Sequence, residues 1–149
     1  MDARLSYREA AVRGASPVGL VVLLYDQVLE DLRRAVAACG QGAIEIRTRE
    51  INHAILVLGQ LQGSLDMERG GAAARNLDQF YTMMRQSLVQ AQCQQSVEEL
   101  EQQITHLMLL REAWVEVDQA TAAATAAAST DAALPPEDTP PGVLRNWSA

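Results

Sequence analysis

Four stretches of this sequence repeat their apolar residues at alternating steps of three and four. This period constrains the fold more than any other feature, because it places those residues on one face of an α-helix. The third stretch shows it most clearly, with Ala74, Leu77, Tyr81, Met84, Leu88 and Ala91. Equivalent stripes begin at Val18, Ile44 and Val97. No stretch alternates as a strand would, so the sequence predicts an all-α fold.

Helix-start and helix-stop signals separate the four stripes. Ser16-Pro17 is a helix start, because serine caps free N–H groups and proline suits the first helical position. Cys39-Gly40-Gln41-Gly42 and Gly70-Gly71 are breaks, and Ser96 with Glu99 forms a capping box. The stretches between them are each about 20 to 24 residues long, or 30–35 Å as helices. Short connections favour antiparallel neighbours, so we expect an antiparallel four-helix bundle.

The sequence divides into three parts. Residues 1–15 are expected to form an N-terminal arm or a short helix, residues 16–118 the bundle, and residues 119–149 an Ala/Pro-rich disordered tail. An alternative for the start of the tail is that its alanines prolong the last helix until Pro135. Val143, Leu144 and Trp147 form a small apolar cluster near the end. Either this cluster folds back on the bundle or engages another protein, or it is an unstructured end.

Charge and composition exclude several classes of function. The chain carries 12 arginines, no lysine and 19 acidic residues, a net charge of −7. An acidic chain without a basic cluster is a poor ligand for nucleic acids and anionic membranes. We find no apolar run long enough to cross a bilayer and no signal-peptide centre, so we expect a cytoplasmic protein without membrane insertion. In that reducing compartment Cys39 and Cys93 are expected to be free thiols.

Catalytic motifs are missing from the sequence. The one pattern to weigh is Glu50-x-x-His53, a unit that di-iron helical bundles use in duplicate. The second histidine, His106, follows Gln103 where such a site needs a carboxylate. We therefore predict no metal site, no cofactor and no enzyme activity, and interpret both histidines as polar helix positions.

The helices carry more apolar residues than one stripe each requires. The surplus residues are Leu20, Leu24, Leu56, Val57, Phe80 and Met83. Gly59 and Gly63 lie four residues apart within the second helix, where a small residue permits close approach of another backbone. Two explanations remain open. A central helix packs on several sides or the protein dimerises, or the surplus forms a groove for an apolar segment of another chain.

From Tyr7 to Trp114 the sequence resembles the FliS family of flagellar export chaperones. The matching pieces are, in order, Tyr7, Ala15-Ser16-Pro17, Leu23-Leu24-Tyr25-Asp26, Leu61, Ser64-Leu65-Asp66, Gly70-Gly71, Asn76-Leu77, Phe80-Tyr81, Leu88, Ala91 and Leu110-Arg111-Glu112-Ala113-Trp114. Their order and spacing are more specific than any single piece. The sequence departs from the family pattern at Gln27, Met83 and Gln92, where the family commonly has glycine, tyrosine and asparagine.

The resemblance implies a function and partners. Such proteins are four-helix bundles that bind the disordered C-terminal segment of flagellin in the cytoplasm. They prevent its premature polymerisation and help to present it to the export gate of the flagellar type III secretion apparatus. The client segment forms helices along apolar grooves, and the N-terminal arm covers part of that surface until the client arrives. An anti-sigma factor is a further partner reported for the family.

Roles for individual residues follow from the same resemblance. Tyr7 is expected to dock the arm into the groove, and Leu77 belongs to the client surface with the surplus residues and the two glycines. Tyr25 and Asp26 are expected to join the client site, and so is Tyr81, although Tyr25 also fits a core position with its hydroxyl satisfied. Asn76 either bonds to the client backbone or caps the preceding turn. The competing hypothesis is a helical adaptor that homodimerises through these faces and has no flagellin client.

Overall fold

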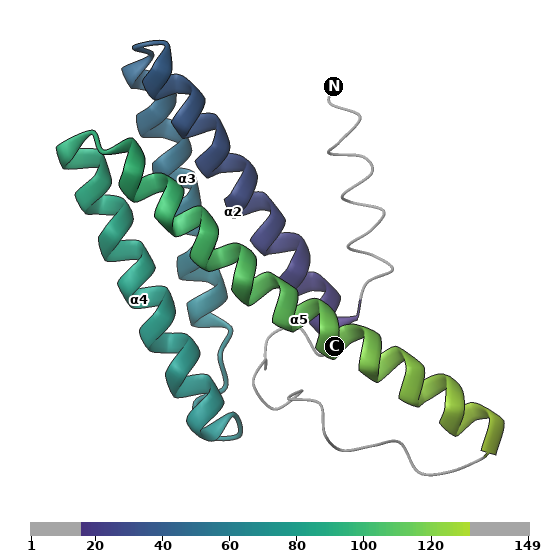
Figure 1. Cartoon of the computed structure of the whole chain (residues 1–149). Helices are drawn as coiled ribbons and strands as arrows, with labels where there is room; N and C mark the ends of the chain where they lie inside the picture. Colours follow the sequence, from purple (N-terminus) through teal and green to yellow (C-terminus); the bar gives the residue numbers. More distant parts are fainter. Residues whose placement is uncertain (1–15, 132–149) are drawn as a thin grey trace.

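The computed structural model describes residues 16–131 and contains four helices there (Figure 1). They are α2 (Pro17–Gly40), α3 (Ile44–Gly63), α4 (Gly71–Gln94) and α5 (Val97–Asp131). The described residues form no extended sheet, and the four helices match the four predicted stripes. The prediction of an all-α helical bundle is confirmed. Residues 1–15, assigned to an N-terminal arm, lie outside the described residues.

The helix ends use the residues that the sequence marks. The Ser16 hydroxyl accepts a hydrogen bond from the Gly19 N–H at 3.0 Å, with Pro17 next to it at the helix start. The Ser96 hydroxyl accepts from the Glu99 N–H at 3.1 Å, as the capping box predicts. Gly71 has a φ of +55°, a conformation that residues with a side chain rarely adopt, which explains a glycine at the turn into α4.

Each helix packs mainly on two others. Helix α2 contacts α3 and α5, and α4 contacts the same two from the opposite corner. In Figure 1, α3 lies behind α2, and α4 lies at the left of the bundle. Within the described residues, no helix has the length and apolarity needed to span a membrane.

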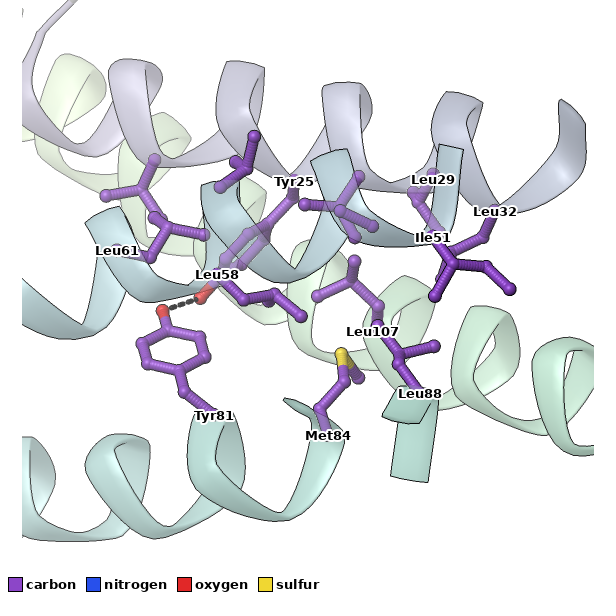
Figure 2. Packing of buried hydrophobic residues seen from close by; sticks show 14 of the residues in the cluster. Tyr25, Leu29, Leu32, Ile51, Leu58, Leu61, Tyr81, Met84, Leu88 and Leu107 are labelled. Carbon is purple, nitrogen blue, oxygen red and sulfur yellow. Dashed lines mark hydrogen bonds between the residues drawn. The ribbon is translucent and has the colours of Figure 1, made fainter. Parts of the chain in front are cut away.

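The core lies where the four stripes meet, as Figure 2 shows. Its largest fully buried side chains are Tyr25, Tyr81, Leu32, Ile51, Leu58, Leu61, Met84, Leu88, Leu100, Leu107, Val21 and Val28. All four helices contribute, because each stripe faces the shared axis. The sequence stripes therefore identify the core.

Helix α5 is longer than we predicted. It continues through Asp131, so residues 119–131 are helical where we expected a disordered tail. The alternative, that alanines prolong the helix, describes this stretch, because alanine has the highest helix propensity of any residue. Figure 1 shows this end of α5 projecting past the other helices. Before this projecting end, the hydroxyl of Ser16, the N-cap residue of α2, donates a hydrogen bond of 2.7 Å to Asp118 Oδ1 of α5. The cluster around Trp147 lies outside the described residues.

Candidate partner-binding surface

Helices α3 and α4 expose large apolar side chains to solvent. Leu56 on α3 is 59% exposed, and Met83 on α4 is 66% exposed. Val89, two turns further along α4, is 52% exposed. Side chains of this kind contribute little to a core when they point into water, and gathered on neighbouring helices they are typical of an interaction surface.

A cleft runs between these two helices. It encloses about 400 Å³ and is lined by Ile55, Thr82, Arg85, Gln86 and Val89. Leu56 follows Ile55 on α3, and Met83 follows Thr82 on α4. Because a helix turns about 100° per residue, both side chains point to solvent and away from the cleft wall. We call the cleft together with these exposed side chains of its two helices, Leu56 and Met83, the α3/α4 groove. Its largely apolar lining suits an apolar segment of a partner.

A network of polar side chains joins α3 to α4 at two of the residues that line the cleft, Thr82 and Arg85. The amide of Gln62 donates to Asp78 Oδ1 at 2.8 Å and to Thr82 Oγ1 at 2.7 Å, and its carbonyl accepts from Arg85 Nη1 at 2.9 Å. Gln62 therefore connects α3 to three residues of α4. This network fixes the position of the Arg85 side chain at the margin of the cleft.

Three buried side-chain atoms of α3 and α4 have no hydrogen-bond partner within the described part of the chain. They are Arg47 Nε, Arg85 Nε and Gln92 Oε1. Of these three residues, Arg85 is the one that lines the cleft.

Several predicted site residues lie at the α3/α4 groove. Leu56 and Met83 are exposed on the two helices that border the cleft, and Gly59 and Gly63 are on α3 with Leu56. A Cβ atom placed on Gly59 would lie 3.7 Å from Cζ of Arg85, so the guanidinium packs directly over this position. Gly63 has no atom within 4 Å of such a Cβ and faces open space.

Three predicted site residues lie in the core instead. Val57, Tyr25 and Tyr81 are 4%, 0% and 1% exposed, so a partner on the folded bundle cannot reach them. The two tyrosine hydroxyls hydrogen-bond to each other at 2.6 Å (Figure 2). Burial is the main cause that raises the pKa of both hydroxyls above their ordinary range. The prediction that these residues form the partner surface is corrected: they support it from inside.

The other predicted site residues lie away from the cleft or outside the described chain. Asp26 accepts two hydrogen bonds from Arg111 of α5, so its carboxylate already has a partner within the bundle. Leu24, Leu77 and Phe80 are half-buried and pack against the core. The remaining three fall into different classes: Leu20 is half-buried, Asn76 is exposed and Tyr7 lies outside the described residues.

Sequence reasoning missed the polar part of the groove. Thr82, Arg85 and Gln86 were not singled out, because polar residues on a helix surface are usually solvated. A signal was present: on α4, Thr82, Arg85 and Val89 recur at steps of three and four beside the core stripe. Only the pairing of α4 with α3 shows that this second stripe lines a cleft.

The Glu50-x-x-His53 pattern has a structural use. His53 Nδ1 lies 2.5 Å from Oδ2 of Asp31, a fully buried carboxylate of α2, and Glu50 Oε2 lies 3.2 Å from Nε of Arg34. Asp31 also accepts from Gln27 and Arg34. Burial is the largest cause that raises the pKa of Asp31, outweighing these partners. Among the residues that the structure describes, no group of three potential ligands could hold a metal ion.

Comparison with known proteins places the chain in one family. Residues 1–121 match the family described as flagellar protein FliS. The chain is 32% identical over 110 residues to the flagellar secretion chaperone FliS of Salmonella typhimurium, which covers 73% of this chain and 82% of that protein. It is 35% identical over 106 residues to the flagellar secretion chaperone FliSB of Pseudomonas aeruginosa, covering 71% and 84%.

A third relative is the flagellar secretion chaperone FliS of Vibrio cholerae, 29% identical over 109 residues, or 73% of this chain and 80% of that protein. The matched region includes all the residues of the α3/α4 groove. On the family match over residues 1–121 and these relatives, the chain belongs to the FliS family of flagellar proteins.

Proposed function

We propose that this protein is a flagellar export chaperone that binds the C-terminal segment of flagellin along the α3/α4 groove. The observation that carries the proposal is the exposure of Leu56 and Met83 on the two helices that border an apolar cleft. The names of its relatives support the flagellar part, since each is called a flagellar secretion chaperone. The groove supports the binding part.

The mechanism follows from what the groove offers. A segment that is disordered alone and amphipathic when helical gains apolar burial by lying against Leu56, Met83 and Val89. Part of that gain offsets the entropy of ordering the segment. While bound, its apolar face is unavailable to other flagellin molecules, so it does not polymerise in the cytoplasm. The complex then delivers the client to the flagellar type III export apparatus, and the anti-sigma factor is a second candidate partner.

The test compares three single substitutions of similarly exposed residues. Leu56→Asp and Met83→Asp place a charge at the groove, and Leu109→Asp places one on α5, where Leu109 is 63% exposed. We expect the first two to weaken binding to full-length flagellin at least tenfold, and the third to change it less than twofold. Flagellin lacking its C-terminal segment should not bind. Circular dichroism melting of each variant checks that the fold is retained.

Two outcomes contradict the proposal. If intact and truncated flagellin bind equally well, or if the wild-type chain binds neither, then the C-terminal segment of flagellin is not the client. A stable dimer in light scattering that Leu56→Asp or Met83→Asp dissociates assigns the groove to a second copy of the chain. That result would support the homodimerising adaptor instead.

A further inference from the structure

Arg85 supplies the positive charge among the five residues that line the cleft. The other lining residues are the apolar Ile55 and Val89 and the neutral Thr82 and Gln86. A charged group at the margin of an apolar cleft contributes little to burial of a partner's apolar face. It does select for a partner that carries the opposite charge.

The hydrogen bonding of Arg85 is incomplete. Its Nη1 donates to the neutral carbonyl oxygen of Gln62, and its buried Nε has no acceptor. By contrast, three arginines form ion pairs with a carboxylate within 4.0 Å, namely Arg34, Arg49 and Arg111. Within residues 16–131, no such pair includes Arg85.

The surrounding residues hold the guanidinium in place, and Gln62 lies between it and the carboxylate of Asp78. Asp78 bonds to the amide of Gln62, and Gln62 in turn accepts from Arg85. The guanidinium packs over Gly59, where a Cβ would lie 3.7 Å from both Cζ and Nη2. Because Gln62 and the Gly59 backbone position the planar group, little side-chain entropy is lost when a partner binds it.

We propose that Arg85 recognises an acidic side chain of the segment bound in the α3/α4 groove. The carboxylate of an Asp or Glu on the apolar face of that segment accepts from the N–H groups of Arg85 Nη2, which donate to no residue within the described chain, while the buried Nε stays inside the bundle. Apolar contacts alone permit the segment to slide by a helical turn, whereas one ion pair in the cleft selects a single register. This inference rests on the proposed function and names the chemistry that its client must carry.

The test is a double-mutant cycle between chaperone and client. Calorimetry measures the affinity of the flagellin C-terminal segment for the wild-type chain, Arg85→Gln, Arg85→Lys and the control Arg75→Gln, an exposed arginine of the same helix. Each Asp and Glu of the segment is replaced singly by Asn or Gln. We expect Arg85→Gln to weaken binding at least tenfold, Arg85→Lys to restore part of the loss, and Arg75→Gln to stay within twofold.

One acid replacement in the client should reproduce the loss of Arg85→Gln and cause no further loss when combined with it. Because that change leaves the chaperone unaltered, it also separates recognition from misfolding of the variant. The inference is overturned if the affinity of Arg85→Gln for the segment is within twofold of the wild-type affinity. It is also overturned if the loss caused by each acid replacement in the client adds fully to the loss caused by Arg85→Gln. The proposed function survives that result as long as Leu56→Asp and Met83→Asp still weaken binding at least tenfold. If the wild-type chain binds no segment at all, both proposals are wrong.

Discussion

The hydroxyl oxygens of Tyr25 and Tyr81 lie 2.6 Å apart in the core and join α2 to α4 across the bundle. Their rings meet edge to face, with centroids 6.4 Å apart. The Trp114 ring of α5 also meets the Tyr25 ring edge to face, with centroids 6.5 Å apart. Tyr25 is thus the centre of a buried aromatic contact among three helices, and a buried hydroxyl that loses its partner destabilises the fold.

Substitutions of the two tyrosines are predicted to be non-additive. Tyr25→Phe and Tyr81→Phe each leave one buried hydroxyl without its hydrogen-bond partner, so each should lower the free energy of unfolding by about 1–3 kcal/mol. Because Tyr25→Phe with Tyr81→Phe removes both hydroxyls and leaves neither unpaired, the double substitution should cost less than the sum of the single ones. Urea unfolding measures all three, and strictly additive effects would contradict the network.

The stability of the bundle should depend on the ionisation of Asp31. Its pKa is raised in the folded protein above the ordinary value of 3.8, mainly by burial. Between 3.8 and the folded value, the folded state therefore holds a proton that the unfolded state releases. This contribution to stability is complete below pH 3.8 and is lost as the pH rises through the folded pKa.

Asp31→Asn removes this titration. We expect the wild type to gain stability relative to Asp31→Asn as the pH is lowered from 7 toward 4, measured by urea unfolding. Gln27 and Arg34 of α2 and His53 of α3 face the carboxylate, and Glu30 and Glu50 interact with Arg34. The comparison is therefore repeated in a His53→Gln background, which leaves burial as the main cause. A stability difference that shrinks on acidification would show that the pKa is lowered instead.

Gly59→Ala should stabilise the protein. Gly59 lies inside α3, and glycine in a helix interior is less favourable than alanine by about 0.5–1 kcal/mol. The added Cβ would meet Arg85 at 3.7 Å, an ordinary contact distance. We expect the free energy of unfolding to rise by up to ~1 kcal/mol. Gly63→Ala, at the last residue of α3, should give a smaller gain, and a loss of stability in Gly59→Ala would show that the guanidinium is displaced.

Asp26 and Arg111 provide a test of whether Asp26 belongs to the partner surface. Their side chains are about one-third exposed and form a two-point ion pair, with Nε to Oδ1 at 2.5 Å and Nη2 to Oδ2 at 3.3 Å. A double-mutant cycle of Asp26→Asn and Arg111→Gln should give a coupling of about 0.2–1 kcal/mol that weakens with salt. Client affinity should stay unchanged in Asp26→Asn. A tenfold loss of client affinity in Asp26→Asn would show that Asp26 belongs to the binding site.

Local signals in the sequence predicted the helices well. The steps of three and four identified Ile51, Leu58 and Leu88 as core residues, and Ser16 and Ser96 marked helix starts, because periodicity and capping depend on neighbours within a few residues. The same signals were ambiguous for residues 119–131. Alanine favours a helix there, while the low complexity of the stretch favours disorder.

Tertiary packing decided which surplus apolar residues remain on the surface. Leu56 and Val57 are adjacent and similar in character, yet one is 59% exposed and the other 4%, because a helix turns about 100° per residue and only one of them faces α2 and the core. Tyr25 is buried because Tyr81 and Trp114, 56 and 89 residues away, supply its partners. The sequence by itself determined four amphipathic helices and their stripes. The position of Arg85 beside Gln62 and Gly59 was decided only when α3 and α4 paired, because the register between two helices depends on contacts along their whole length.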